Sequence, residues 1–359
     1  MFECRLVDTE SGLETIADDW RSLHERAGLT PFADYDFIEL WWKHFGKCDG
    51  WRLHIICGYE NGKLVAVLPL AIIKRKGMRV LKWAGNDTCD YCDVLVEKPE
   101  YADLLWATVR ESKQYDFAVL EDVRPDTFSS SILEKFAEKH ATNNSYHLEI
   151  NWKSGKEWFA SLSRPARSKF SRRVKHMKEK GPVAFEMRKA GEVPDSIIED
   201  FIRLKIDWAK KLDKQGIFQK EGVSQYFHDL FKKQPHGYNL LVFYITCNAT
   251  TVAVMSCITH KNKAYGYSLA YNPEWGEFSP GNMVSTNLVM YIVDNGFSVF
   301  DFLRGDEAYK LRYTNKSNQL NEFTFSRNIL GSLGLVYHNL RREINRARRI
   351  RAAKKKQSD

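Results

Sequence analysis

The chain has 359 residues, of which 43% are hydrophobic and 28% are charged, so it can build a large core or two domains of ordinary size. No apolar run approaches the roughly 20 residues that cross a bilayer, and the first residues lack the basic and apolar regions of a secretory signal. The seven cysteines are scattered and odd in number. These features predict a soluble cytoplasmic protein with reduced thiols and without a transmembrane segment.

The net charge of +8 is concentrated in two segments. Residues 164–180 hold eight basic residues and one acidic residue, and residues 341–359 hold nine basic and two acidic residues, so each segment carries +7. The rest of the chain is therefore net acidic. Each basic segment is a candidate contact for a nucleotide phosphate, RNA, an acidic glycan or a lipid head group, although a charged run is more often a solvated face.

In the first half, the pattern alternates between helices and strands. An Asn-Gly pair at positions 61 and 62 lies between two alternating apolar runs and predicts a β-hairpin. Trp41, Trp42 and Phe45 either pack in the core or stack on a sugar ring. We expect helices over 10–26, 36–44, 102–112 and 130–139, and strands over 52–59, 64–73, 79–83, 93–96 and 117–120.

The second half contains three consecutive strand-like runs with short polar connectors, which predict an antiparallel meander. A loop, a helix and a further strand follow it. We expect helices over 157–163, 166–179, 195–212, 223–233 and 281–295, and strands over 183–188, 240–246, 252–259, 264–271 and 299–303.

Both halves contain a hairpin followed by a helix and a strand, which indicates an α/β (α+β) protein with two similar folds in tandem. We expect mixed, largely antiparallel sheets. The predicted domains are 1–150 and 151–330, followed by a basic C-terminal helix or tail over 331–359.

Three stretches carry a family resemblance. Residues 31–46 are similar to the opening of bacterial proteins with a GNAT-like acetyltransferase 6 domain. Residues 271–281, with Tyr-Asn-Pro-Glu and Ser-Pro-Gly, and residues 300–310, with Phe-Asp-Phe-Leu-Arg-Gly-Asp-Glu and Tyr-Lys, look like the signature block of that family. The resemblance implies tandem acyl-CoA N-acyltransferase folds and a link to polysaccharide or cellulose biosynthesis. The family also resembles Fem-type peptidyltransferases, which use aminoacyl-tRNA.

An acyl-CoA donor carries a pyrophosphate, which the amides at a helix N-terminus can bind. Ser279, Gly281, Asn282 and Met283 follow the third meander strand, where the resemblance places the donor. Glycine permits close approach of the backbone. A typical GNAT protein has a longer Gln/Arg-x-x-Gly-x-Gly/Ala loop, and only one glycine remains here. An ordinary serine cap with proline in the first turn is therefore the alternative.

Acyl transfer needs a base for the proton of the acceptor and an acid for the leaving thiolate. Asp301 or Asp306 is the candidate base, and Tyr309 is the candidate acid. Arg304 and Lys310 are candidates for holding an anionic acceptor or the donor phosphates. The alternative is an internal arginine–aspartate pair that braces this turn.

The basic segment at 164–180 is predicted to be an amphipathic helix with Ala166, Phe170, Val174 and Met177 on one stripe. Arg172 and Arg173 are the preferred contacts for an anionic substrate or tRNA, with a plain solvated face as the alternative.

The C-terminal segment contains Leu335, Val336, Leu340 and Ile344, which we expect to dock on the body as a helix. Beyond them, residues 346–356 are either a solvated end or a contact for anionic lipid or polymer.

Cys89 and Cys92 form a CxxC without a second ligand pair, so we expect no metal site. The prediction is an acyltransferase that moves an acyl group from acetyl-CoA or another acyl-CoA directly to an amine or hydroxyl of a small molecule or glycan precursor. A Fem-like transferase that uses aminoacyl-tRNA and a non-catalytic binding protein with the same fold are the alternatives.

Overall fold

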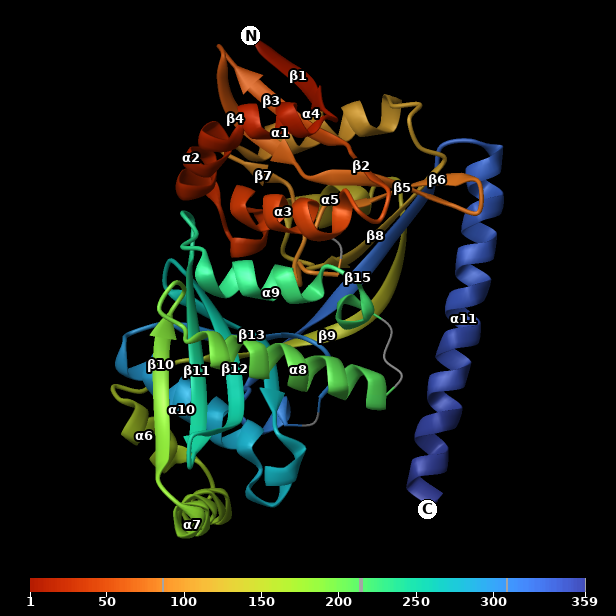
Figure 1. The fold of residues 1–359 in the computed structure, drawn as a ribbon. Helices are drawn as coiled ribbons and strands as arrows, with labels where there is room; N and C mark the ends of the chain where they lie inside the picture. The colour runs from red at the N-terminus through yellow and green to blue at the C-terminus, as the bar shows by residue number, and fades with distance from the viewer. Residues whose placement is uncertain (86, 213–215, 308, 359) are drawn as a thin grey trace.

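A computed structural model describes residues 1–85, 87–212, 216–307 and 309–358, with the backbone alone from residue 345 onward. Two units of mixed α/β structure follow one another along the chain (Figure 1). In the described residues, a four-stranded sheet belongs to the first unit, and an 11-stranded sheet runs through both.

The first half contains the elements up to β9. They are β1 (Phe2–Val7), α1 (Glu10–Thr15), α2 (Ala17–Ala27), a 3₁₀ turn (Pro31–Ala33), α3 (Tyr35–Trp41), a π-helical turn (Trp42–Gly46), β2 (Trp51–Leu53), β3 (Ile55–Glu60), β4 (Lys63–Leu68), β5 (Leu70–Arg75), β6 (Met78–Trp83), β7 (Leu95–Val96), α4 (Pro99–Glu111), β8 (Phe117–Val123), α5 (Phe128–Leu133) and β9 (Glu138–Glu149).

The second half contains the remaining elements. They are α6 (Gly155–Ser161), α7 (Arg164–Lys180), β10 (Val183–Lys189), α8 (Asp195–Lys211), a 3₁₀ turn (Ile217–Gln219), α9 (Val223–Lys232), β11 (Asn239–Cys247), β12 (Thr250–His260), β13 (Lys263–Tyr271), a 3₁₀ turn (Pro273–Phe278), α10 (Pro280–Asp294), β14 (Val299–Arg304), a 3₁₀ turn (Lys310–Arg312), β15 (Lys316–Ser326) and α11 (Ile329–Ser358).

The strand order shows how the two units are joined. The large sheet has the order β10-β11-β12-β13-β14-β9-β15-β8-β6-β5-β2, and the small sheet has the order β1-β3-β4-β7. Strand β9 follows β8 in the chain but pairs with β14, whereas β15 follows β14 and pairs with β8. Each unit therefore receives its last strand from the other, and β9 and β15 pair with each other at the centre.

The two units also share a topology. In each, an antiparallel run leads to a strand, a helix and a parallel strand: β6, α4 and β8 in the first unit, and β13, α10 and β14 in the second. Helices α8 and α10 contact opposite faces of the second-unit sheet (Figure 1). The predicted tandem fold with largely antiparallel sheets is confirmed, while the boundary at residue 150 stays a prediction.

Several predicted elements are confirmed and others need correction. The predicted hairpin is confirmed, with its turn at Asn61 and Gly62, which both have positive φ. The predicted meander is confirmed as β11-β12-β13. The predicted strand over 64–73 is two strands, because Pro69 has no amide to donate to a ladder. The predicted helix over 130–139 ends at Leu133, and a strand begins at Glu138. Strand β15 was not expected.

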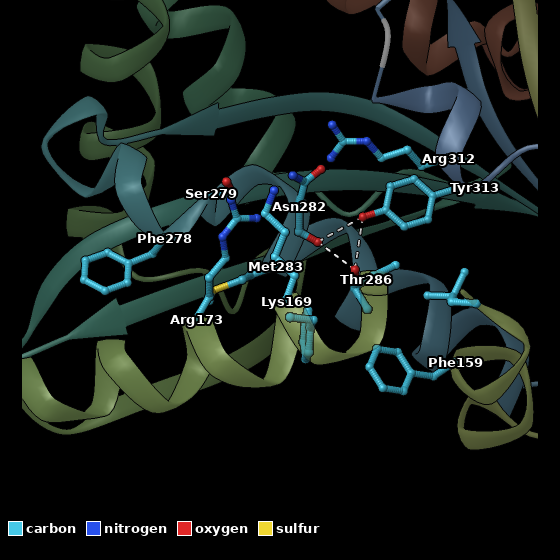
Figure 2. A pocket seen from close by; sticks show the side chains of 13 residues that line it. Phe159, Lys169, Arg173, Phe278, Ser279, Asn282, Met283, Thr286, Arg312 and Tyr313 are labelled. Carbon is cyan, nitrogen blue, oxygen red and sulfur yellow. Dashed lines mark hydrogen bonds between the residues drawn. The ribbon is translucent and has the colours of Figure 1, made fainter. Parts of the chain in front are cut away.

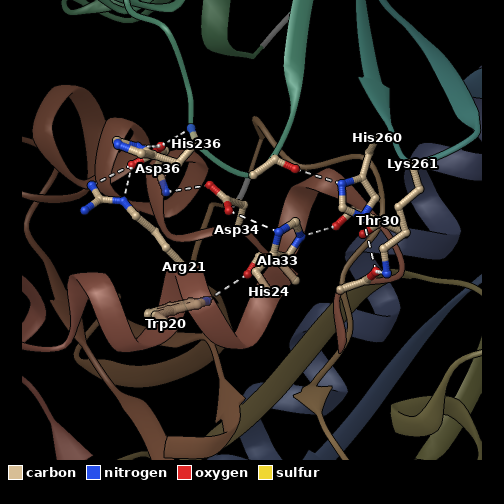
Figure 3. Close-up of polar contacts among 12 residues, drawn as sticks. Trp20, Arg21, His24, Thr30, Ala33, Asp34, Asp36, His236, His260 and Lys261 are labelled. Carbon is tan, nitrogen blue, oxygen red and sulfur yellow. Dashed lines mark hydrogen bonds and ion pairs between the residues drawn. The ribbon is translucent and has the colours of Figure 1, made fainter. Parts of the chain in front are cut away.

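One hydrophobic core cluster contains side chains of both halves, and a polar network between them lies beside it (Figure 3). Asp36 accepts hydrogen bonds from Arg21 Nη2 at 2.7 Å and from the backbone amide of His236 at 2.9 Å. Nε2 of the buried His260 lies 3.1 Å from the carbonyl oxygen of Gly28. These contacts join α2 and α3 to the meander and fix the two halves against each other.

The predicted basic C-terminal helix is confirmed as α11. Its predicted docking residues need correction, because Leu335 packs against the core whereas Val336, Leu340 and Ile344 are exposed. Trp41 and Phe45 are buried, so the core alternative holds for both of these aromatic residues. None of the described helices combines the length and the apolarity that crossing a bilayer requires.

Candidate functional site

The neighbouring strands β13 and β14 separate in the middle of the second unit. They pair in parallel only where Lys263, Ala264 and Tyr265 face Val299, Phe300 and Asp301. Beyond this point a cavity of about 320 Å³ opens between the strands. Leu303 has a left-handed φ of 59° at the end of β14, and the register against β9 shifts there, which turns the strand out of the regular ladder.

A second cavity, of about 380 Å³, adjoins the first one between α8, β13 and the loop of the first half at residues 87–90. We call the two cavities together the inter-half cleft. The residues that line both are Asp90, Lys205, Trp208, Tyr267, Ser268 and Arg304. The cleft therefore combines a separated pair of strands with a wall from the other half.

Arg304 lies in this cleft between two carboxylates of the first half. Its Nε lies 2.7 Å from Asp90 Oδ1, and its Nη1 is paired with Asp122. Burial raises the pKa of Asp122 to about 7 and also raises the pKa of Asp90, while Arg304 opposes both shifts. The alternative in which Arg304 belongs to an internal ion pair is therefore the one the geometry supports.

Lys310 is buried at the edge of the same cleft. Its Nζ donates hydrogen bonds to the carbonyl oxygens of Arg304 at 2.6 Å and Leu303 at 3.3 Å, and it lies 2.9 Å from Glu307 Oε2. These bonds hold the turn that follows β14. A role for Arg304 or Lys310 in holding a substrate anion stays a prediction, since both cations already have partners.

Asp301 points away from the inter-half cleft. It is buried, and its Oδ1 accepts hydrogen bonds from the Tyr91 hydroxyl at 2.8 Å and the Leu303 amide at 2.7 Å, while Oδ2 lies 3.5 Å from Arg124 Nη1. Burial raises its pKa. Asp301 does not line either cavity of the cleft, so the geometry gives it a bracing position.

The other two predicted catalytic residues lie apart from each other. Asp306 is exposed and accepts hydrogen bonds from Asn144 and from the Tyr146 hydroxyl, each at 3.1 Å. Tyr309 lines the cleft between β13 and β14, and burial raises its pKa. Of the three predicted catalytic residues, Tyr309 is thus the one that the structure brings to the cleft.

The start of α10 forms a separate small pocket with α7, which we call the α7–α10 pocket (Figure 2). It has a volume of about 90 Å³. Ser279 is in the N-cap position with a left-handed φ of 52°, and its side chain makes no cap hydrogen bond. The Ser279 hydroxyl therefore does not cap α10, and no other side chain among the described residues caps the first amides of this helix.

Three cations surround this helix start. Lys169 and Arg173 from α7 and Arg312 from the turn after β14 line the α7–α10 pocket together with Ser279 and Asn282. The pKa of Arg173 is lowered, first by partial burial and then by the neighbouring cations. A helix N-terminus with clustered cations is a favourable place for an anion.

The remaining predicted donor residues lie on either side of the first turn of α10. Met283 is buried and lines the α7–α10 pocket. On the other side, a Cβ at Gly281 would lie 3.3 Å from Leu269 and 3.7 Å from Tyr271, two residues that line the inter-half cleft. Gly281 lines neither cavity, but it lies in the chain between Ser279 and Asn282 of the pocket lining and next to Leu269 of the cleft lining. Arg172 is exposed and lies outside the residues that line the pocket.

The first half contributes residues to this site that no sequence motif indicates. Asp90 and Tyr91 lie between Cys89 and Cys92 of the CxxC, and they bond to Arg304 and Asp301. Burial raises the pKa of both thiols. Within the described residues, no group of side chains could hold a metal ion.

Residues 164–311 match the model of the acetyltransferase (GNAT) domain. No curated protein sequence matches the chain. The crystal structure of FemX is similar, with a TM-score of 0.59 and 11% identity over 90% of this chain and 97% of that one.

Two further solved structures have a similar fold. The C-terminal domain of a putative lysylphosphatidylglycerol synthetase from Agrobacterium fabrum gives a TM-score of 0.56 at 11% identity, over 90% of this chain and 95% of that one. A conserved protein of unknown function from Bacteroides thetaiotaomicron gives 0.53 at 11% identity, over 90% and 99%.

At such identities the likeness shows the fold. The chain has a GNAT-like fold of the kind seen in FemX, and its second half carries an acyltransferase domain of the GNAT type. The matched segment contains Arg173, Ser279, Gly281, Arg304 and Lys310.

Proposed function

We propose that the protein transfers an acyl group, with acetyl as the first candidate, from acyl-CoA to an amine or hydroxyl of a glycan precursor or small molecule in the inter-half cleft. The observation that carries this proposal is the separation of β13 and β14 beside an uncapped helix start surrounded by cations. A thioester arm fits such a gap, and a diphosphate fits such a helix start.

The donor would be held in two parts. Its phosphates would contact the first turn of α10 together with Lys169, Arg173 and Arg312, which line the α7–α10 pocket. Its pantetheine arm would pass Gly281, where the absence of a side chain leaves room beside Leu269. The acyl group would then reach the cavity between the two separated strands.

The acceptor would enter from the side where the first half closes the cleft. Trp208 and Tyr267 line the cleft there, with Lys205 Nζ 4.7 Å from the centroid of the Trp208 ring, and Asp87 and Asp90 provide carboxylates. Aromatic side chains combined with acidic hydrogen-bond acceptors suit a sugar or an amino sugar. This lining supports a glycan precursor as the acceptor and a place in polysaccharide biosynthesis. The seven free thiols are typical of a reducing compartment such as the cytoplasm.

Asp90 would be the base, and Tyr309, the predicted acid, would protonate the leaving thiolate. The acceptor nitrogen or oxygen would form a bond to the carbonyl carbon while its proton moves to Asp90, and the carbon–sulfur bond would break with a proton from Tyr309 to the thiolate. Asp90 lines both cavities, and burial raises its pKa toward the range in which a carboxylate accepts a proton efficiently. The predicted bases Asp301 and Asp306 lie outside the cleft lining.

Donor binding is the first test. Acetyl-CoA at about 100 times its dissociation constant should stabilise the protein by about 2.7 kcal/mol, which a thermal shift experiment detects. Coenzyme A should give a similar shift, whereas dephosphorylated pantetheine should give much less. An unchanged melting temperature with every acyl-CoA tried would leave a non-catalytic binding protein as the better reading.

The choice of base can be tested separately. Asp90→Asn should lower kcat at least 100-fold in an assay of thiol release with amino sugars and amines, because general base catalysis contributes roughly that much. Asp306→Asn is the matched control and should retain activity, since Asp306 is exposed and outside the cleft lining. The reverse pattern would restore Asp306 as the base.

The second candidate function is that of a transferase whose donor is aminoacyl-tRNA. The exposed basic side chains of α7 favour it. Helix α7 carries eight basic residues, and Met177 is its one fully buried residue. Binding of tRNA should weaken by orders of magnitude between about 50 and 200 mM salt, because many counterions are released. Tight tRNA binding with that salt dependence, and no response to acyl-CoA, would replace the first proposal.

A further inference from the structure

Helix α11 packs on the body through one face. Two glycines let it approach closely, because a Cβ at Gly331 would lie 1.8 Å from the carbonyl oxygen of Asp116, and one at Gly334 would lie 2.6 Å from the Phe117 ring. Further along the same face, Leu335 packs against the core. The body therefore holds the first turns of this helix in a defined orientation.

Polar contacts continue this docked face. His338 Nε2 and Arg342 Nη1 lie 3.1 Å and 2.9 Å from the same oxygen of the buried Glu322, and they lower its pKa although burial opposes this. Tyr337, at the edge of the face, accepts a hydrogen bond from Lys76 at 2.7 Å. The rotation of α11 about its own axis is thus fixed by contacts from residue 331 to residue 342.

The opposite face of α11 is apolar and exposed. At about 100° per residue, its five aliphatic side chains fall within roughly 80° of arc. Each of them is between 45% and 84% exposed. They are Ile329, Leu333, Val336, Leu340 and Ile344. A surface helix normally shows the reverse pattern, with apolar residues against the body and polar residues outward, so this stripe is suited to a contact outside the chain.

The same helix carries the second basic segment of the chain. Residues 341–359 have a net charge of +7, and α11 extends through most of them, to Ser358 (Figure 1). The apolar stripe and the basic segment thus follow one another along a single helix. An apolar stripe followed by clustered Lys and Arg residues is the pattern of helices that lie in the interface of an acidic membrane.

We infer that α11 docks the protein on the surface of a membrane rich in acidic phospholipids. The aliphatic stripe enters the boundary between head groups and acyl chains, and the basic segment lies over the acidic head groups. Charge complementarity selects this occupant over a second copy of the chain, because two copies paired in parallel through the stripe would bring two segments of +7 together. The inference does not rest on the proposed acyl transfer.

The test is vesicle flotation with the full-length protein. We expect binding at least tenfold tighter to vesicles of phosphatidylglycerol and phosphatidylcholine than to vesicles of phosphatidylcholine alone, and weaker binding at high salt. The double variant Leu333→Glu/Leu340→Glu should bind the acidic vesicles at least tenfold more weakly. Because both side chains are exposed, the melting temperature of the variant should match that of the wild type, which separates loss of docking from loss of folding.

Leu104→Glu is the matched control, since Leu104 is an exposed leucine of α4 outside the stripe, and it should leave vesicle binding unchanged. Three results would overturn the inference: no binding to either vesicle, equal binding to both, or unchanged binding of the double variant. A wild-type dimer in analytical ultracentrifugation that the double variant breaks would assign the stripe to a second copy and would also overturn it.

Discussion

The two halves of the molecule differ at the start of an equivalent helix, which is α4 in the first half and α10 in the second. In the first half, α4 begins after Lys98 and carries Glu100 in its first turn, so its own carboxylate faces the positive end of the helix. In the second half, α10 begins after Ser279 and has no acidic residue in its first turn, while neither helix start has a side-chain cap within the described structure. Three cations from other elements surround it. An anionic ligand therefore suits the second helix start and not the first.

The strands that follow these helices, β8 and β14, also differ in the space beside their ends. Asp122 and Leu303 occupy similar places near the ends of β8 and β14, with left-handed φ values of 60° and 59°. In the first half, the space at Asp122 is a cavity of about 50 Å³ lined by Trp83, Cys89 and Cys92, with Arg304 closing it. In the second half, the gap is about 320 Å³. The second repeat therefore has open space at the position where the first repeat is nearly closed.

The largest expected effect concerns the arginine that joins the two repeats. Arg304→Met should lower the free energy of unfolding by about 3–5 kcal/mol, because it leaves the buried Asp122 and the largely buried Asp90 without their cation. Urea denaturation measures this. Arg203→Met is the control: Arg203 pairs with Asp200 on the surface of α8, and its loss should cost much less. Equal costs would show that the cluster does not couple the repeats.

Charge reversal at the second helix start should have the next largest effect. Arg173→Glu combined with Arg312→Glu should weaken acyl-CoA binding about 100-fold, because two attractive charges become repulsive in a partly enclosed pocket. Isothermal titration calorimetry measures the dissociation constant. Lys98→Glu makes a related change at the start of α4 and should leave the affinity unchanged. A loss of affinity with Lys98→Glu would place a donor site in the first repeat.

The buried His54 of the first repeat should make the stability of the protein depend on pH. Burial, with a smaller contribution from Arg52, lowers the pKa of His54 to about 4. The unfolded chain then binds more protons than the folded chain between about pH 6.5 and 4, so stability falls as the pH falls through this window. The expected loss between pH 7 and 4.5 is about 2 kcal/mol from this residue.

The variant His54→Leu should show a loss of stability on acidification that is smaller by about this amount, as measured by urea denaturation at several pH values. Donor affinity measured at neutral pH should not change. If the variant and the wild type lost stability in parallel, the pH dependence would belong to other groups.

The smallest expected effect is steric. Gly281→Val should weaken donor binding at least tenfold, because its methyl groups would enter the narrow space beside Leu269 and Tyr271. Gly276→Val is the control in the preceding turn, where a Cβ meets nothing within 4 Å. Normal donor binding by the Gly281 variant would contradict the path that we propose for the pantetheine arm.

The parts of the fold with local signals could be predicted from the sequence. The Asn61-Gly62 hairpin, the meander and the helix start at Pro280 each follow from turn residues or apolar alternation over a few positions. Strands β9 and β15 could not be predicted in this way. They pair with each other at the centre of the sheet, and β9 is largely polar, so no alternating pattern identifies it.

The candidate site was only half predictable for a similar reason. Ser279 and Gly281 lie in one of the stretches that resemble a family motif, and Tyr309 lies in another. Asp90 lies 214 positions before Arg304, and their contact depends on how the two repeats are packed. No local pattern records that packing. The sequence therefore identifies Arg304 through its motif, but it does not identify Asp90, the carboxylate that pairs with it.

The crossed arrangement of β9 and β15 bears on how the polypeptide can be divided. A fragment cut near residue 150 would keep β9 without β14, and the complementary fragment would keep β15 without β8. Each would present a long unpaired edge and would be prone to aggregate by itself. When the two fragments are expressed together, β9 can pair with β14 and β15 can pair with β8. The molecule is therefore a candidate for a split reporter whose signal depends on reassembly of the fragments.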